Sequence, residues 1–66
     1  MKYVVVDIND AVRYGYLDPD QKWEGSELLI GEDGYAYIDD VANDPVKGNW
    51  DFEQACIDFP NNVVEI

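Results

Sequence analysis

The N-terminal residues show the clearest strand pattern in the chain. Residues 2–8, KYVVVDI, are rich in β-branched and aromatic side chains and contain neither glycine nor proline, which is typical of a β-strand. Because side chains alternate along a strand, Val4, Val6 and Ile8 share one face. This all-aliphatic face is expected to point into the core.

The next segment, residues 9–17 (NDAVRYGYL), fits two structures. A turn at Asn9 would lead into a second strand, and one face of that strand would carry Val12, Tyr14 and Tyr16. Alternatively, Asn9 caps a short helix over 10–14 that Gly15 closes. We favour the strand, because a helix of so few residues is weak by itself.

A β-hairpin is predicted in the middle of the chain. Residues 26–30 (SELLI) and 35–39 (YAYID) are extended patterns, and the loop 31–34 (GEDG) between them has glycine at both ends. Loops are expected on both sides of this hairpin, at 18–20 (DPD) and 40–48 (DVANDPVKG), because both contain proline and aspartate.

The clearest helix pattern lies at residues 50–59, WDFEQACIDF. An apolar stripe at helical spacing is formed by Phe52, Ala55, Cys56 and Phe59. Asn49 is expected to be the N-cap, and Pro60 stops the helix. We expect the two phenylalanines to be buried against the first strand and the hairpin, and residues 63–66 to form a short last strand.

These elements predict an α+β fold for a single domain spanning 1–66. Its small, mostly antiparallel sheet has four to five strands, and its main helix packs on one face. A single helix covers only one face of a sheet. The opposite face is therefore expected to be solvated, to form a dimer or to bind a partner.

The net charge of the chain is the feature that bears most on its function. Fifteen Asp and Glu residues stand against four Lys and Arg, which gives a formal net charge of −11. Such a charge destabilises a small domain through self-repulsion, and it opposes direct binding to nucleic acid or to an anionic membrane. It indicates either a positively charged partner, protein or ribonucleoprotein, or an organism whose proteins are generally acidic.

The side-chain inventory excludes most catalytic chemistry. The chain has no histidine and no threonine, its only serine is Ser26, and its only cysteine, Cys56, lies on the apolar helix stripe. Nucleophilic triads, zinc sites and phosphate-binding loops cannot be built from these residues, and no segment matches a calcium loop. We expect no catalytic residue, no metal and no cofactor. A single cysteine, with no membrane span or signal peptide in the pattern, favours a cytoplasmic location.

The tyrosines suggest where a partner binds. Tyr35 and Tyr37 alternate with Ala36 and Ile38, which fit beneath the helix, so the two rings are expected on the helix-free face. Strand pairing would bring to the same face Tyr3, Tyr14 and Tyr16. Tyrosine is favoured at interfaces, although it is also common on half-exposed sheets.

In size, composition and lack of catalytic groups, the chain resembles the small acidic DNA mimics of phages and mobile elements. These include anti-CRISPR proteins, anti-restriction proteins and inhibitors of uracil-DNA glycosylase. The resemblance implies a non-enzymatic inhibitor, acting in the host cytoplasm as a monomer or weak homodimer. The alternative is an acidic antitoxin, an immunity protein or a general interaction module. The predicted partner-binding residues are Asp7, Asp18, Asp20, Glu32, Asp33, Tyr35, Tyr37, Asp39 and Asp40.

Overall fold

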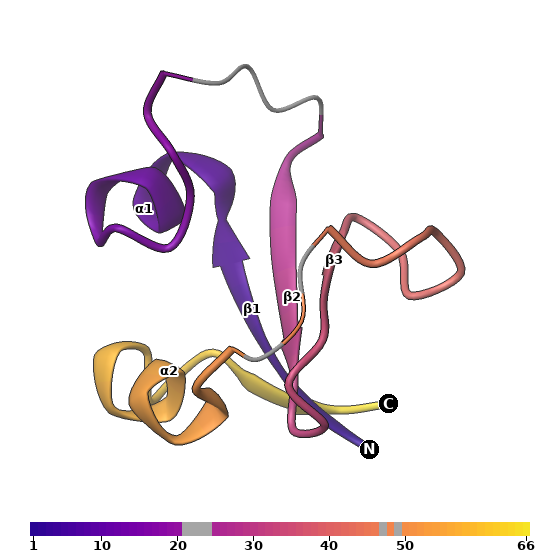
Figure 1. Ribbon diagram of the computed structural model, residues 1–66. Helices are drawn as coiled ribbons and strands as arrows, with labels where there is room; N and C mark the ends of the chain where they lie inside the picture. Colours follow the sequence, from indigo (N-terminus) through magenta and orange to yellow (C-terminus); the bar gives the residue numbers. More distant parts are fainter. Residues whose placement is uncertain (21–24, 47, 49) are drawn as a thin grey trace.

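The computed structural model describes residues 1–20, 25–46, 48 and 50–66. An antiparallel sheet of four strands has the order β3-β2-β1-β4 (Figure 1). The strands are β1 (Lys2–Asp7), β2 (Glu27–Gly31), β3 (Ala36–Ile38) and β4 (Val63–Glu65). The predicted α+β class is confirmed, and so are the first strand, the hairpin and the last strand, with small differences at their ends.

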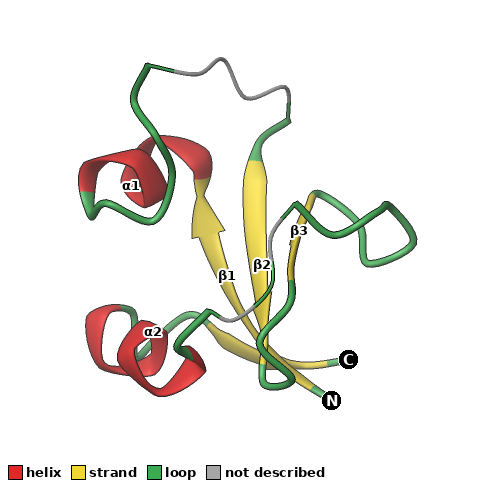
Figure 2. Ribbon diagram, viewed as in Figure 1, coloured by secondary structure: helices red, strands yellow, loops and turns green. Residues whose placement is uncertain are grey.

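Two helices, α1 (Ile8–Arg13) and α2 (Phe52–Asp58), lie on the same side of the sheet (Figure 2). The prediction of α2 over 50–59 is confirmed, although the helix is shorter at both ends. Its N-cap is Asp51, whose Oδ1 accepts a hydrogen bond from the Gln54 N–H at 3.1 Å. The predicted cap, Asn49, lies outside the described residues.

The preference for a strand over 9–17 was wrong, because the first part of this segment is α1. Asp7 caps the helix by accepting a hydrogen bond from the Asn9 N–H at 2.8 Å, and Gly15 follows its end with a φ of 86°. Ile8 and Ala11 are one helical turn apart and both are buried. Their burial against the sheet stabilises a helix that is too short to persist alone.

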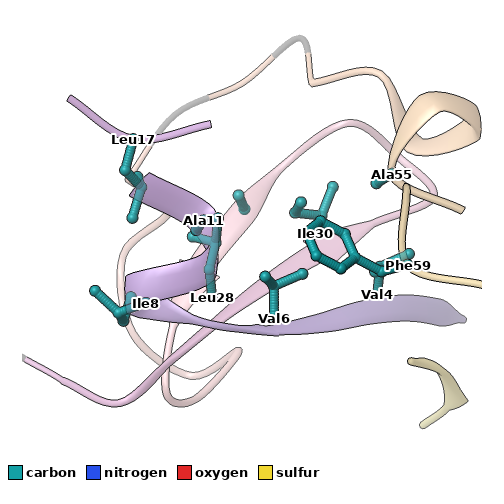
Figure 3. Packing of buried hydrophobic residues seen from close by; sticks show 10 residues of the cluster. Val4, Val6, Ile8, Ala11, Leu17, Leu28, Ile30, Ala55 and Phe59 are labelled. Carbon is teal, nitrogen blue, oxygen red and sulfur yellow. The ribbon is translucent and has the colours of Figure 1, made fainter. Parts of the chain in front are cut away.

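The core lies between the sheet and the two helices (Figure 3). Val4 pairs with Ile30 and Val6 with Leu28, and all of these side chains are fully buried. Each such side chain contributes about 1.5–3 kcal/mol on burial. The helices and the segments that follow them add to this core Ile8, Ala11, Leu17, Ala55 and Phe59. The predicted aliphatic face of the first strand is thus confirmed.

The predicted burial of both helix phenylalanines is only half right. Phe59 is buried at the end of α2, but Phe52, in the first turn, is half-buried at the margin of the core. The difference follows from position, because α2 contacts β1 and β2 and Phe52 is its first residue.

The opposite face of the sheet has no helix, yet it is not fully solvated. Tyr3 and Leu29 are each only 6% exposed there. Tyr3 is the cross-strand partner of Gly31, and a Cβ at Gly31 would lie 3.1 Å from the Tyr3 ring. A glycine in the strand therefore leaves room for the tyrosine ring to lie over the backbone. Tyr37 meets the same ring edge-on, with 6.4 Å between centroids.

The prediction that the tyrosines share this face was wrong for two of them. Tyr14 and Tyr16 follow α1 and contact Phe59 on the helix side, with ring centroids 4.6 and 5.9 Å away. They lie on the helix side, contrary to the prediction, because 9–17 contains a helix and a turn instead of a strand. The face expected to be tyrosine-rich therefore carries Tyr3 and Tyr37, while Tyr35, just before β3, has its ring beside Gly48.

Candidate partner-binding surface

The predicted partner-binding residues lie at several places on the molecule. Glu32 and Asp33 are in the turn between β2 and β3, whereas Asp39 and Asp40 follow β3 at the other end of the hairpin. Asp7 ends β1, and the remaining acids, Asp18 and Asp20, follow α1. Figure 1 shows the turn near the chain termini and the segment after β3 away from them. The structure thus divides the predicted surface into separate acidic regions.

One region, which we call the Asp39 corner, consists of Asp7, Glu27 and Asp39. Asp7 and Glu27 are cross-strand partners, and the Asp39 N–H donates to the Glu27 carbonyl at 3.0 Å. Asp39 has a φ of 64°, a left-handed conformation that aspartate tolerates better than most residues. Glu27 was not predicted as a site residue, because it appeared only as the start of a strand.

The Asp39 carboxylate is committed to the fold. Its Oδ1 accepts hydrogen bonds from the Ser26 N–H at 2.8 Å and the Glu27 N–H at 3.0 Å. These two backbone donors hold the pKa of Asp39 below its usual value. The carboxylate therefore ties the start of β2 to the end of β3.

Other predicted acids have smaller structural roles. Several accept a hydrogen bond from the backbone N–H two residues further along, as aspartates commonly do in turns. These pairs are Asp7 with Asn9, Asp18 with Asp20, Asp33 with Tyr35, and Asp40 with Ala42. All of these carboxylates remain exposed, so each keeps its charge at the surface while shaping its own turn.

A second acidic region borders a groove at the β2–β3 turn, which we call the turn groove. Its volume is about 630 Å³, and it is lined by Glu32, Asp33, Gly34, Trp50, Asp51, Phe52 and Glu53. The backbone N–H of Trp50 donates to the Gly34 carbonyl at 2.9 Å. This bond joins the segment just before α2 to the turn. Two acids from each segment therefore surround two aromatic rings.

The sequence predicted only half of this groove. Glu32 and Asp33 were expected at the partner surface, but residues 50–53 (WDFE) were assigned to the start of a helix. Their alternation of aromatic and acidic side chains is the signal that was available, and residues 31–35 (GEDGY) likewise combine acids with an aromatic side chain. The sequence does not say that the two segments lie together, because they are far apart in the chain.

A half-buried polar contact lies next to Trp50. Tyr16 stacks on Trp50, with ring centroids 5.8 Å apart and an interplanar angle of 20°. The Tyr16 hydroxyl donates to Asp58 Oδ2 at 2.5 Å, and Gln54 Nε2 donates to Asp58 Oδ1 at 3.2 Å. Burial, together with the hydrogen bond to Asp58, raises the pKa of Tyr16. The phenol therefore stays protonated and fixes one face of the indole.

The two hairpin tyrosines differ in exposure. Tyr37 is half-buried against Tyr3, whereas Tyr35 is 48% exposed and its ring lies beside Gly48. Burial, Tyr37 and the charges of Asp33 and Glu32 raise the pKa of Tyr3. The acids of the turn are therefore close enough to act electrostatically on the helix-free face of the sheet.

The surface charge is mostly unpaired. Fifteen acids cannot all find partners among four cations, and between the described residues one ion pair forms, Arg13 with Asp10 at 3.6 Å. Every described carboxylate is exposed except those of Asp10 and Asp58, which are half-buried. Within the same residues, no group of three His, Cys, Asp or Glu side chains has the arrangement to hold a metal ion.

Comparison with protein-family models, with curated proteins and with solved structures finds no match for this chain. In the described part of the chain, neither helix has the length and apolar character needed to cross a bilayer.

Proposed function

We propose that this protein is a non-enzymatic inhibitor that binds the basic, nucleic-acid-binding surface of a host defence or DNA-processing complex. The observation that carries the proposal is the net charge of −11, displayed on exposed carboxylates that the four cations cannot neutralise. A surface of this kind is attracted to a basic groove and repelled by nucleic acid. It would act as a monomer or weak homodimer in the host cytoplasm, as phage anti-CRISPR and anti-restriction proteins do.

Exposed acids two positions apart, Asp18 with Asp20 and Asp51 with Glu53, add paired negative charges to the surface. The first pair lies in a turn and the second at the start of α2. The spacing of roughly 6–7 Å along an extended strand, about twice the rise per phosphate of one DNA strand, therefore does not apply to either pair. The partly exposed rings of Trp50, Phe52 and Tyr35 add apolar contact area, which the phosphate backbone of DNA does not offer.

The proposal is tested by competition. The protein, immobilised on beads, is used to capture partners from a bacterial lysate, and the captured complex is purified and identified by mass spectrometry. Its binding to its own DNA or RNA is then measured by gel shift with increasing amounts of this protein. We expect loss of the shifted band and its recovery with excess nucleic acid.

Simultaneous binding of this protein and the nucleic acid to the complex would overturn competition. Capture of a partner that binds no nucleic acid would favour the alternative, an acidic immunity protein, an antitoxin or a general interaction module. A control variant, Asp44→Asn with Glu65→Gln, changes the net charge by only two units at exposed positions outside the predicted partner-binding residues and should still compete.

A further inference from the structure

We infer that the turn groove receives an arginine side chain of the basic partner. This inference rests on the proposed function and specifies how one part of the surface recognises its target. The groove combines acidic side chains with aromatic rings, and arginine is the side chain that suits both.

Charge complementarity is the first argument. Glu32 and Asp33 approach from the hairpin turn, and Asp51 and Glu53 approach from the start of α2. All of these carboxylates are exposed, and none of the described residues that line the groove is cationic. A guanidinium that enters the groove therefore meets negative charge on two sides and can form bidentate hydrogen bonds with a carboxylate.

The aromatic lining is the second argument. Trp50 and Phe52 are half-buried, and both line the groove. A cation over such a ring is attracted by its electron-rich face, most strongly at tryptophan. Arginine also stacks its planar group on aromatic rings, which lysine cannot do. Aromatic rings are not ligands for a metal ion, and the four carboxylates would repel an anion.

The groove is also held in place before any partner arrives. Glu32 is fixed by two contacts with Lys2: its N–H donates to the Lys2 carbonyl and its Oε1 accepts from the Lys2 N–H, both at 3.0 Å. Trp50 is held by Gly34 on one side and by the stacked Tyr16 ring on the other. The groove residues therefore lose little conformational entropy when a side chain binds, which favours recognition.

The test uses a short arginine peptide as the probe. The 15N-labelled protein is titrated with acetyl-Gly-Arg-Gly-Arg-Gly amide, and amide and indole signals are followed by NMR. Trp23→Phe assigns the Trp50 indole. We expect saturable shifts concentrated at the Trp50 indole N–H and the backbone N–H groups of Gly34, Asp51 and Glu53. A peptide with citrulline in place of arginine has the same shape without the charge and should cause no such shifts.

Matched charge variants separate the groove from the general negative field. Asp51→Asn with Glu53→Gln removes two charges from the groove and keeps a good N-cap. Asp20→Asn with Asp44→Asn removes two exposed charges elsewhere. We expect the first variant to weaken peptide binding roughly fivefold and the second less than twofold, since each exposed ion pair has a modest effect. Unchanged signals away from the groove confirm that both variants are folded.

Equal weakening by the two variants, or shifts spread over the whole surface, would overturn the inference. Shifts centred on the helix-free face around Tyr37 would do the same and would assign the occupant to that face. The two proposals fail separately. If the peptide does not bind the groove but the protein still competes with nucleic acid, only the arginine site is wrong. If the peptide binds the groove but the protein does not compete with nucleic acid, the arginine site is supported and the proposed inhibitor function is wrong.

Discussion

At the turn end of the β2–β3 hairpin, Glu32 and Asp33 stand beside the turn groove. At the opposite end, Asp39 and Asp40 lie where β3 runs into the next loop. Both ends carry two consecutive acids that are exposed to solvent. The Asp39 carboxylate accepts two backbone hydrogen bonds across the hairpin, whereas the acids of the turn line a groove together with Trp50, just before α2, and Phe52, its first residue.

What an acid does is therefore decided by its neighbours. Backbone N–H groups that converge on Asp39 make its carboxylate part of the fold, and its substitution should change stability. Aromatic rings beside Glu32 and Asp33 make those carboxylates part of a surface that suits a cationic side chain. Their substitution should change binding. The following predictions test this division.

The largest effect is expected from Gly25→Ala at the Asp39 corner. Gly25 has a φ of 129°, and an added Cβ would lie 2.4 Å from Ile38 Cγ2 and 2.8 Å from Asp39 Oδ2. We expect a loss of about 2–4 kcal/mol in the free energy of unfolding, measured with urea, from strain and overpacking together. Gly15→Ala is the control, because φ is 86° but nothing lies within 4 Å. Equal losses in the two variants would show that the corner is not tightly packed.

Tyr16→Phe tests the polar contact next to Trp50. Loss of the hydrogen bond to Asp58 should lower the free energy of unfolding by about 1 kcal/mol. Because the pKa of Tyr16 is raised above 10.0 in the folded protein, the stability it contributes is complete below pH 10 and is lost as the pH rises further. The difference between wild type and variant should therefore shrink above pH 10. A constant difference up to pH 12 would contradict this.

A smaller effect, opposite in sign at the two hairpin ends, is expected from neutralising single acids. Asp39→Asn weakens two hydrogen bonds and should lower the Tm by a few degrees. Glu32→Gln weakens only the one from the Lys2 N–H and also relieves repulsion with Asp33, so it should raise the Tm. The pKa of Asp39 is lowered from 3.8, so its contribution is present above about pH 4 and is lost as the pH falls through the folded pKa. The Asp39→Asn deficit should vanish in strong acid. A change of the Tm in the same direction for both variants would contradict the proposed difference between the two ends of the hairpin.

The smallest effect is expected from salt. With a net charge of −11, the Tm should rise between low and physiological ionic strength, because screening weakens repulsion between exposed carboxylates. Self-repulsion is a collective property. Two double variants should therefore weaken the salt dependence of the Tm equally. They are Asp7→Asn with Glu27→Gln at the corner, and Asp51→Asn with Glu53→Gln at the groove. A flat Tm in the wild type would mean that the charges are already compensated.

Several elements were determined by the sequence alone. The alternation at 2–8, the glycine-bounded turn at 31–34 and the apolar stripe of 50–59 predict a strand, a hairpin and a helix that the structure contains. These patterns are local, and each places apolar side chains on one face with the right period. The excess of acids and the lack of catalytic side chains were likewise evident without a fold.

The segment 9–17 was decided by tertiary structure. Its pattern permitted a strand or a helix, and the helix forms because Ile8 and Ala11 fit into the core between the sheet and Leu17. The side on which Tyr14 and Tyr16 lie followed from that choice. The burial of Tyr3 was also a tertiary result, because it depends on a cross-strand glycine that no local pattern connects to it.

The division between structural and surface acids was also decided by the fold. Asp39 and Asp33 are alike in the sequence, since each belongs to an acidic pair beside a predicted strand. Only the paired strands bring the Ser26 and Glu27 N–H groups to Asp39, and only the bond from Trp50 to Gly34 brings two aromatic rings to the turn. A local pattern specifies which side chains share a face. Contacts between distant segments depend on strand register and loop closure, which are set when the whole core packs.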